Sequence, residues 1–172
     1  FFLYASGDSD PRDEDANGFD AIVDAPNFGG GQFSFWNSQA LKLVGTGLTQ
    51  PGSSLADLQT SKSQGQANFV NPGLILMGGG LDARVSPTIR AEFNVNYLLF
   101  DRPESTELLV FQRDVHRELG VDYNLGIQYR PLLTDNVIIN FGAAIFQPLE
   151  GFADLYETKN RLYHGFIELV LV

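Results

Sequence analysis

The sequence contains no cysteine, which excludes disulfide bonds, thiolate metal ligands, haem-attachment motifs and cysteine nucleophiles. It also lacks any apolar run near the ~20 residues that a membrane-spanning helix needs, which excludes a helical membrane protein. Basic residues are few, 11 against 21 acidic ones, and the formal net charge of −10 argues against binding nucleic acid through a basic surface. The composition therefore leaves a soluble domain or a membrane β-barrel.

Apolar and polar residues alternate strictly in two stretches of the chain. Every odd position of 89–97 and of 119–130 is apolar, and every even position is polar, charged or glycine. A period of two predicts strands with one apolar and one polar face. In a soluble β protein the apolar face forms the core, whereas in a membrane barrel it contacts lipid and the polar face lines a lumen.

The same pattern predicts antiparallel strands joined by connections of alternating length. The strands are expected near residues 1–6, 72–85, 89–100, 119–130, 137–147 and 161–172. The connections between the last five strands are short, long, short and long, which is typical of a barrel with tight turns at one end and loops at the other. Residues 7–70 form a longer excursion, in which a strand at 41–47 and a short helix at 35–43 are equally compatible with the sequence.

Strand length favours the membrane interpretation. The twelve residues 89–100 extend about 40 Å at roughly 3.3 Å each, and a tilt of roughly 40° leaves about 30 Å of height. This height covers the apolar band of a membrane barrel, which is about 25 Å tall. Tyr97 and Tyr163 fall near the long connections and Tyr129 near a short turn, where aromatic girdles lie in such barrels. The alternative is that these tyrosines are simply good strand formers.

The polar faces supply the candidate pore-lining residues. They are Arg84, Arg90, Glu92, Asn94, Asn96, Asp122, Asn124, Gln128 and Arg130. Across the turn at 86–88, ion pairs of Arg84 with Glu92 or of Arg90 with Asp82 are expected, and a hydrated lumen would avoid the cost of burying these ions. The alternative is the solvated outer face of a soluble sheet.

The last strand indicates how the expected barrel is oriented in the membrane, and the number of strands indicates how much of the barrel this chain forms. Residues 162–172 resemble the final strand of outer-membrane barrels, which ends at the periplasmic side, although the chain ends in Val172 rather than Phe. The short turns are then periplasmic and the long connections extracellular. Six visible strands are fewer than the ~8 of the smallest single-chain barrels. We therefore expect one partial all-β domain over 1–172, the C-terminal strands of a larger transmembrane antiparallel up-and-down β-barrel, with an excursion or lid at 7–70 and hairpin-connected strands at 71–172.

Several short motifs resemble a known family. The segment SGDSDPRD at 6–13 follows the first strand directly, GFD follows at 18–20, NPG begins the next strand at 71–73, and GIQYRP occupies 126–131. Together they resemble the alginate-export family of outer-membrane β-barrels. The resemblance implies a barrel of more strands and passive passage of a polar or anionic solute. Alginate itself does not carry over, because that substrate depends on an arginine- and lysine-rich constriction and these strands carry balanced charge.

The excursion begins with an acidic loop that supplies hard oxygen ligands. Asp8, Asp10, Asp13 and Asp15 have a spacing similar to the start of a calcium loop, but the glycine and distal glutamate of the EF-hand pattern are missing. The loop is therefore either a solvated acidic segment with Asx-turns, which the missing residues favour, or a calcium site bridging loops or lipopolysaccharide. No other cofactor is expected.

Evidence for catalysis is thin, and we do not expect an enzyme. His116 lies beside ordinary surface charges, His164 is alone on a polar face, and Gly29–Gly31 lacks the lysine and context of a phosphate loop. The leading hypothesis is an outer-membrane porin or exporter whose partners are outer-membrane lipid or lipopolysaccharide and a polar solute. One alternative is a barrel that sheathes a periplasmic or extracellular protein partner, such as a multihaem electron-transfer protein. The other is a soluble β-barrel or sandwich that binds a ligand.

Overall fold

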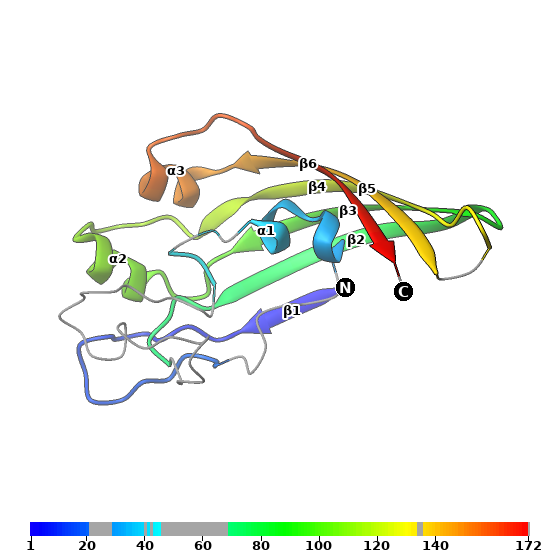
Figure 1. The fold of residues 1–172 in the computed structure, drawn as a ribbon. Helices are drawn as coiled ribbons and strands as arrows, with labels where there is room; N and C mark the ends of the chain where they lie inside the picture. The colour runs from blue at the N-terminus through cyan, green and yellow to red at the C-terminus, as the bar shows by residue number, and fades with distance from the viewer. Residues whose placement is uncertain (21–28, 40, 42, 46–68, 134–135, 172) are drawn as a thin grey trace.

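The computed structural model describes residues 1–20, 29–39, 41, 43–45, 69–133 and 136–171. These residues form a single antiparallel sheet of six strands in the order of the sequence (Figure 1). The strands are β1 (Phe2–Ala5), β2 (Leu74–Ser86), β3 (Ile89–Leu99), β4 (Glu118–Tyr129), β5 (Val137–Pro148) and β6 (Leu162–Leu171).

Each strand pairs with the next in nearly unbroken register. The ladder between β2 and β3 shifts only at Arg84/Ser86, beside the tight turn, and the ladder between β3 and β4 shifts only at Leu98/Leu99. This regularity follows from the period-two pattern, because a slip of one residue would move every apolar side chain to the other face.

The long connections and the tight turns lie at opposite ends of the sheet (Figure 1). A short helix, α2 (Glu104–Val110), lies between β3 and β4, and another, α3 (Glu150–Tyr156), lies between β5 and β6. Two more short helices, η1 (Gly31–Phe33) and α1 (Phe35–Ser38), lie in front of the sheet.

The faces of the sheet are the reverse of those of an ordinary soluble sheet. On the polar face Asn96 and Asp122 are 0 % exposed and Asn124 is 1 % exposed. On the apolar face Ile167 is 73 % exposed and Leu169 is 60 % exposed. Other large apolar side chains on that face are also exposed, namely Met77, Leu81, Val85, Phe93, Leu125, Ile127, Phe141 and Leu171. We call the polar side the inner face and the apolar side the outer face.

A hydrophobic core lies on the inner face near the long connections. Side chains from four strands, α1 and α3 form it, and its buried members are Phe35, Leu74, Leu76, Leu98, Phe100, Val115, Leu119, Ala144, Phe146 and Phe152. The ring of Phe146 stacks on Phe35 at a centroid distance of 5.6 Å and packs against Phe152 at 5.3 Å. The inner face is thus apolar at this end and polar from its middle to the tight turns.

The predicted all-β, antiparallel, up-and-down arrangement is confirmed, but the sheet is open in the described residues, where its edge strands are β1 and β6. The helices in the long connections were not predicted. Of the two options for the excursion, a helix forms over Phe35–Ser38. The described positions of 41–47 contribute only an isolated bridge between Gly45 and Gly73. No described helix is long and apolar enough to cross a membrane.

Candidate functional site: a strap across the inner face

Residues 29–39, which we call the strap, run across the polar middle of the inner face (Figure 1). The carbonyl oxygen of Gly29 accepts hydrogen bonds from Asn96 on β3 at 2.6 Å and from Asn124 on β4 at 3.3 Å. At the other end of the strap, the side-chain amide of Gln39 lies 2.9 Å from Nδ1 of His164 on β6. The strap therefore spans from β3 to β6, and His164, expected to be alone, has a partner.

The carboxylate of Asp122 is the centre of the contact between strap and sheet. Its Oδ2 accepts hydrogen bonds from the Ser34 hydroxyl and from the amides of Asn96 and Asn124, the last two at 3.2 and 3.3 Å. Its Oδ1 accepts from the backbone N–H of Phe35 at 3.2 Å. A carboxylate offers only acceptors, so these four donors occupy the oxygens of a group that the strap has removed from water.

Two glycines allow the strap to approach this closely. Gly30 has φ of 95°, and a Cβ there would lie 2.1 Å from Oδ1 of Asn124. Gly126 on β4 faces the ring of Phe33, where a Cβ would lie 2.4 Å from the nearest ring carbon. The same Phe33 ring stacks on Phe166 of β6 at a centroid distance of 5.7 Å. A Cβ at Gly30 would force Asn124 to move, and a Cβ at Gly126 would force the Phe33 ring to move.

Between the strap and the tight turns the inner face is open and charged. A cleft of about 530 Å³ there is lined by three arginines, Arg84, Arg90 and Arg130, together with Asp82, Gln128 and residues of the turn. A second cleft, of about 420 Å³, lies beside the strap and includes Glu92 and Asn94 in its lining. These two clefts are places on the inner face where a polar solute could bind.

Of the two expected ion pairs across the turn, one forms. Nε of Arg90 donates to both carboxylate oxygens of Asp82 at 2.9 and 3.0 Å, and its Nη2 also contacts Oδ2. Within the described part of the chain Arg84 and Glu92 do not pair, so that expectation is wrong. The register places Arg84 opposite Arg90 and Asp82 opposite Glu92, so both possible pairs are diagonal. Strand twist brings the two diagonals of such a quartet to unequal distances, and here the Asp82–Arg90 diagonal forms the pair.

A row of polar pairs continues across the last three strands. Nη2 of Arg130 donates to Gln128 at 2.9 Å, and Gln128 donates to Asn140 on β5 at 3.3 Å. Asn140 in turn donates to Glu168 on β6 at 2.8 Å. The inner face thus presents balanced charge and amides in an ordered ladder rather than separate solvated side chains.

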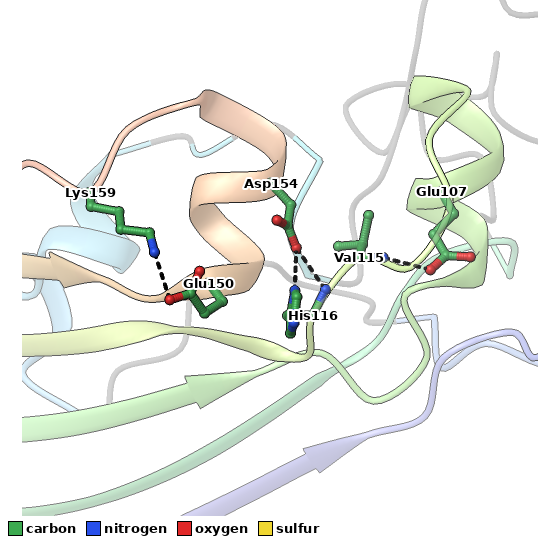
Figure 2. Close-up of polar contacts among 6 residues, drawn as sticks. All are labelled: Glu107, Val115, His116, Glu150, Asp154 and Lys159. Atoms are coloured by element: carbon green, nitrogen blue, oxygen red, sulfur yellow. Dashed lines mark hydrogen bonds and ion pairs between the residues drawn. The ribbon is translucent and has the colours of Figure 1, made fainter.

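Ion pairs and a hydrogen bond join the helices α2 and α3 to the neighbouring connections at the long-connection end of the sheet (Figure 2). Oδ2 of Asp154 on α3 accepts from the backbone N–H of His116 at 2.9 Å and lies 2.9 Å from its Nδ1. Lys159 pairs with Glu150 at 2.6 Å, and Glu107 on α2 accepts from the N–H of Val115 at 2.8 Å. The hydrogen bond to Asp154 raises the pKa of His116. Burial tends to raise the pKa of Asp154, but the hydrogen bonds from His116 outweigh it and lower that pKa.

The acidic loop combines Asx-turns with one buried carboxylate. Oδ1 of Asp10 accepts from the N–H of Arg12 at 3.1 Å, and Oδ1 of Asp13 accepts from that of Asp15 at 2.9 Å. Asp8 is 1 % exposed, so its carboxylate is shielded from water. Burial raises the pKa of Asp8 most. Hydrogen bonds from the backbone of Asn17 and of Asp10 lower this pKa, and the charges of Asp13 and Asp10 raise it.

The candidate pore-lining residues all lie on the inner face, in two groups. Under or beside the strap lie Glu92, Asn94, Asn96, Asp122 and Asn124. At the cleft near the turns lie Arg84, Arg90, Gln128 and Arg130. Sequence reasoning missed the strap, although Ser34 before an apolar pair is a helix N-cap signal. Among the described residues no three acidic or histidine side chains form a ready metal centre, and the calcium site stays a prediction.

Comparison with family models, with curated proteins and with solved structures finds no significant match to this chain.

Proposed function

We propose that this chain forms part of the wall of an outer-membrane β-barrel, with lipid against its outer face and a water-filled lumen at its inner face. The lumen gives passive passage to a polar solute, and the strap narrows it. The carrying observation is the reversed sheet, in which Asn96 and Asp122 are buried while Ile167 and Leu169 are largely exposed. Exposed apolar faces of this size mark a surface that lies against lipid or another apolar partner.

The inner face supports a narrow passage rather than a wide pore. The aromatic core fills it at the long-connection end, the strap covers its middle, and the charged cleft stays open near the turns. Three arginines and one paired aspartate line that cleft. A small anionic or amide-bearing solute is the best match, because guanidinium groups bind carboxylate and phosphate in a bidentate way. The resemblance to the alginate-export family agrees with movement of such a solute through the lumen. Membership of that family stays a prediction.

Cysteine labelling tests the proposal cleanly, because the chain has no native cysteine. The matched pairs are neighbours on opposite faces: Arg84→Cys with Val85→Cys, and Gln128→Cys with Ile127→Cys. In lipid vesicles a water-soluble maleimide should label the two inner positions, and a lipid-soluble quencher should reach a fluorophore only at the two outer positions. Equal aqueous labelling of both faces would contradict the membrane wall.

Measurements of ion conductance then distinguish a barrel with an open lumen from a barrel whose lumen is closed. Reconstituted in a planar bilayer, the protein should give ion-conducting steps, and Asp122→Asn should enlarge them by loosening the strap. A protein that inserts with the labelling pattern above but never conducts would support the alternative of a barrel that sheathes a partner. A protein that stays monodisperse without detergent would refute both membrane functions.

A further inference from the structure

The hairpin of β2 and β3 carries two charges of opposite sign that its own ion pair leaves unused. Asp82 pairs with Arg90 along one diagonal of the ladder. Arg84 and Glu92 lie on the other diagonal, and within the described part of the chain neither forms an ion pair or a hydrogen bond. One guanidinium and one carboxylate therefore remain available to a ligand.

These two residues line adjoining clefts of the inner face. Arg84 lines the cleft of about 530 Å³ beside the turn, and Glu92 lines the cleft of about 420 Å³ beside the strap. Asp82 lines both clefts, so they meet at its ion pair with Arg90. Because that pair is neutral as a whole, the side chains of Arg84 and Arg130 make the first cleft positive, and that of Glu92 makes the second negative.

The spacing of Arg84 and Glu92 suits a small ligand that carries both charges. Diagonal neighbours on paired strands lie roughly 7–8 Å apart, and their side chains rise from the sheet in the same direction. A ligand that bridges them through contacts of about 2.8 Å at each end needs charges only about 3 Å apart. An α-amino acid meets this need, because two bonds of about 1.5 Å each separate its ammonium nitrogen from its carboxyl carbon.

The surroundings of each charge favour the matching group of such a ligand. Glu92 is half-buried and lines a small void together with Phe33 of the strap, so an ion pair there is screened less than one in open solvent. A Cβ at Gly31, in the wall of the same cleft, would meet no atom within 4 Å, so the cleft stays open to a ligand. Arg84 is exposed, and its planar guanidinium can bind a carboxylate through two hydrogen bonds.

We propose that the two clefts together bind an α-amino acid, with its carboxylate on Arg84 and its ammonium group on Glu92. An anion without an ammonium group is repelled by Glu92, and a cation without a carboxylate is repelled by Arg84, so the zwitterion is preferred to both. The site rests on the proposed function only for the passage of the bound solute through the lumen. It narrows the class of solute from small anions to those that also carry an ammonium group.

Binding of three related ligands to the folded full chain tests the site. L-Alanine carries both charges, N-acetyl-L-alanine only the carboxylate, and L-alaninamide only the ammonium group. Calorimetric titration at neutral pH should show that L-alanine binds about tenfold more tightly than either blocked ligand. Equal affinities of the three ligands, or no binding of L-alanine at tens of millimolar, would overturn the proposal.

Two substitutions then assign one group of the ligand to each residue. Glu92→Gln should weaken the binding of L-alanine to the level of N-acetyl-L-alanine, and Arg84→Gln should weaken it to the level of L-alaninamide. The matched control is Glu168→Gln, on the inner face but in the lining of neither cleft, which should bind all three ligands as the unaltered chain does. If either substitution weakens all three ligands by the same factor, that residue acts through the fold and the proposal fails.

Efflux from vesicles separates the site from the passage. Vesicles that contain the protein should release L-alanine faster than N-acetyl-L-alanine, and Glu92→Gln should remove this difference. Binding in the expected pattern without any release would refute the proposed passage and leave the site standing. Release of both solutes at the same rate by the unaltered chain would refute the amino acid as the preferred solute and leave the passage standing.

Discussion

At the scale of single residues, Asp122 carries more of the strap contact than any other described side chain. Asp122→Asn keeps the size of the side chain but replaces one carboxylate oxygen by an NH₂ group. This NH₂ group cannot accept the hydrogen bonds that the oxygen accepted, so donor would face donor. At Oδ2 it would face the amides of Asn96 and Asn124, and at Oδ1 the N–H of Phe35. We expect a loss of about 1.5–3 kcal/mol in the free energy of unfolding, measured by denaturant titration.

The matched control for Asp122 is Glu168→Gln on the same face of the sheet. Glu168 is exposed and accepts one hydrogen bond, from Asn140 at 2.8 Å, which a glutamine oxygen can also accept. Its substitution should change the unfolding free energy by no more than about 0.5 kcal/mol. Equal effects of the two substitutions would mean that the buried hydrogen bonds of the strap contribute no more than surface ones.

At the scale of elements, the ion pair of His116 with Asp154 links the β3–β4 connection to α3. Folding raises the pKa of His116. The stability that protonated His116 contributes is therefore complete at pH values below its ordinary pKa of 6.5, and it is lost as the pH rises through the raised pKa of the folded protein. Folding lowers the pKa of Asp154. The stability that ionised Asp154 contributes is therefore complete above pH 3.8, the ordinary pKa of an aspartate, and it is lost as the pH falls through the lowered pKa of the folded protein. The pair is therefore strongest at mildly acidic pH.

An NMR titration of the imidazole measures this pair directly. The His116 resonance, assigned by its loss in His116→Gln, should titrate above 6.5, and Asp154→Asn should move its midpoint down towards that value. Exchange protection of α3 should also decrease in Asp154→Asn. A midpoint that does not respond to Asp154→Asn would show that the ion pair is absent in solution.

The elements also show what the sequence could and could not predict. The five long strands follow from the period-two alternation, and their observed bounds lie within about two residues of the expected ones. The helices α2 and α3 have seven residues each and no side-chain N-cap, too short for a helical period to appear. The strap is missed because its position depends on long-range contacts, such as Gly29 with Asn96, that no local pattern encodes.

At the scale of the whole molecule, the polar side chains of the described strands β2–β6 lie on one side of the sheet, and the large exposed apolar side chains of those strands lie on the other. A soluble sheet of this kind would expose its apolar face to water, whereas a barrel wall places that face in lipid. A charge introduced on the outer face is therefore tolerated if that face lies in water and is destabilising if it lies in lipid. A position in the middle of a strand separates the two cases best, because it would lie near the bilayer midplane.

Ile167, in the middle of β6 and 73 % exposed, is that position. If it faces lipid, Ile167→Arg should cost roughly 2–4 kcal/mol near the bilayer midplane and reduce folding into vesicles. The neighbouring Glu168→Arg, on the inner face, should fold into vesicles as the unaltered chain does. The readout is the heat-modifiable gel mobility of the vesicle-bound protein. If Ile167→Arg folds as well as Glu168→Arg, the outer face does not lie in lipid, since water would tolerate the arginine at an exposed position.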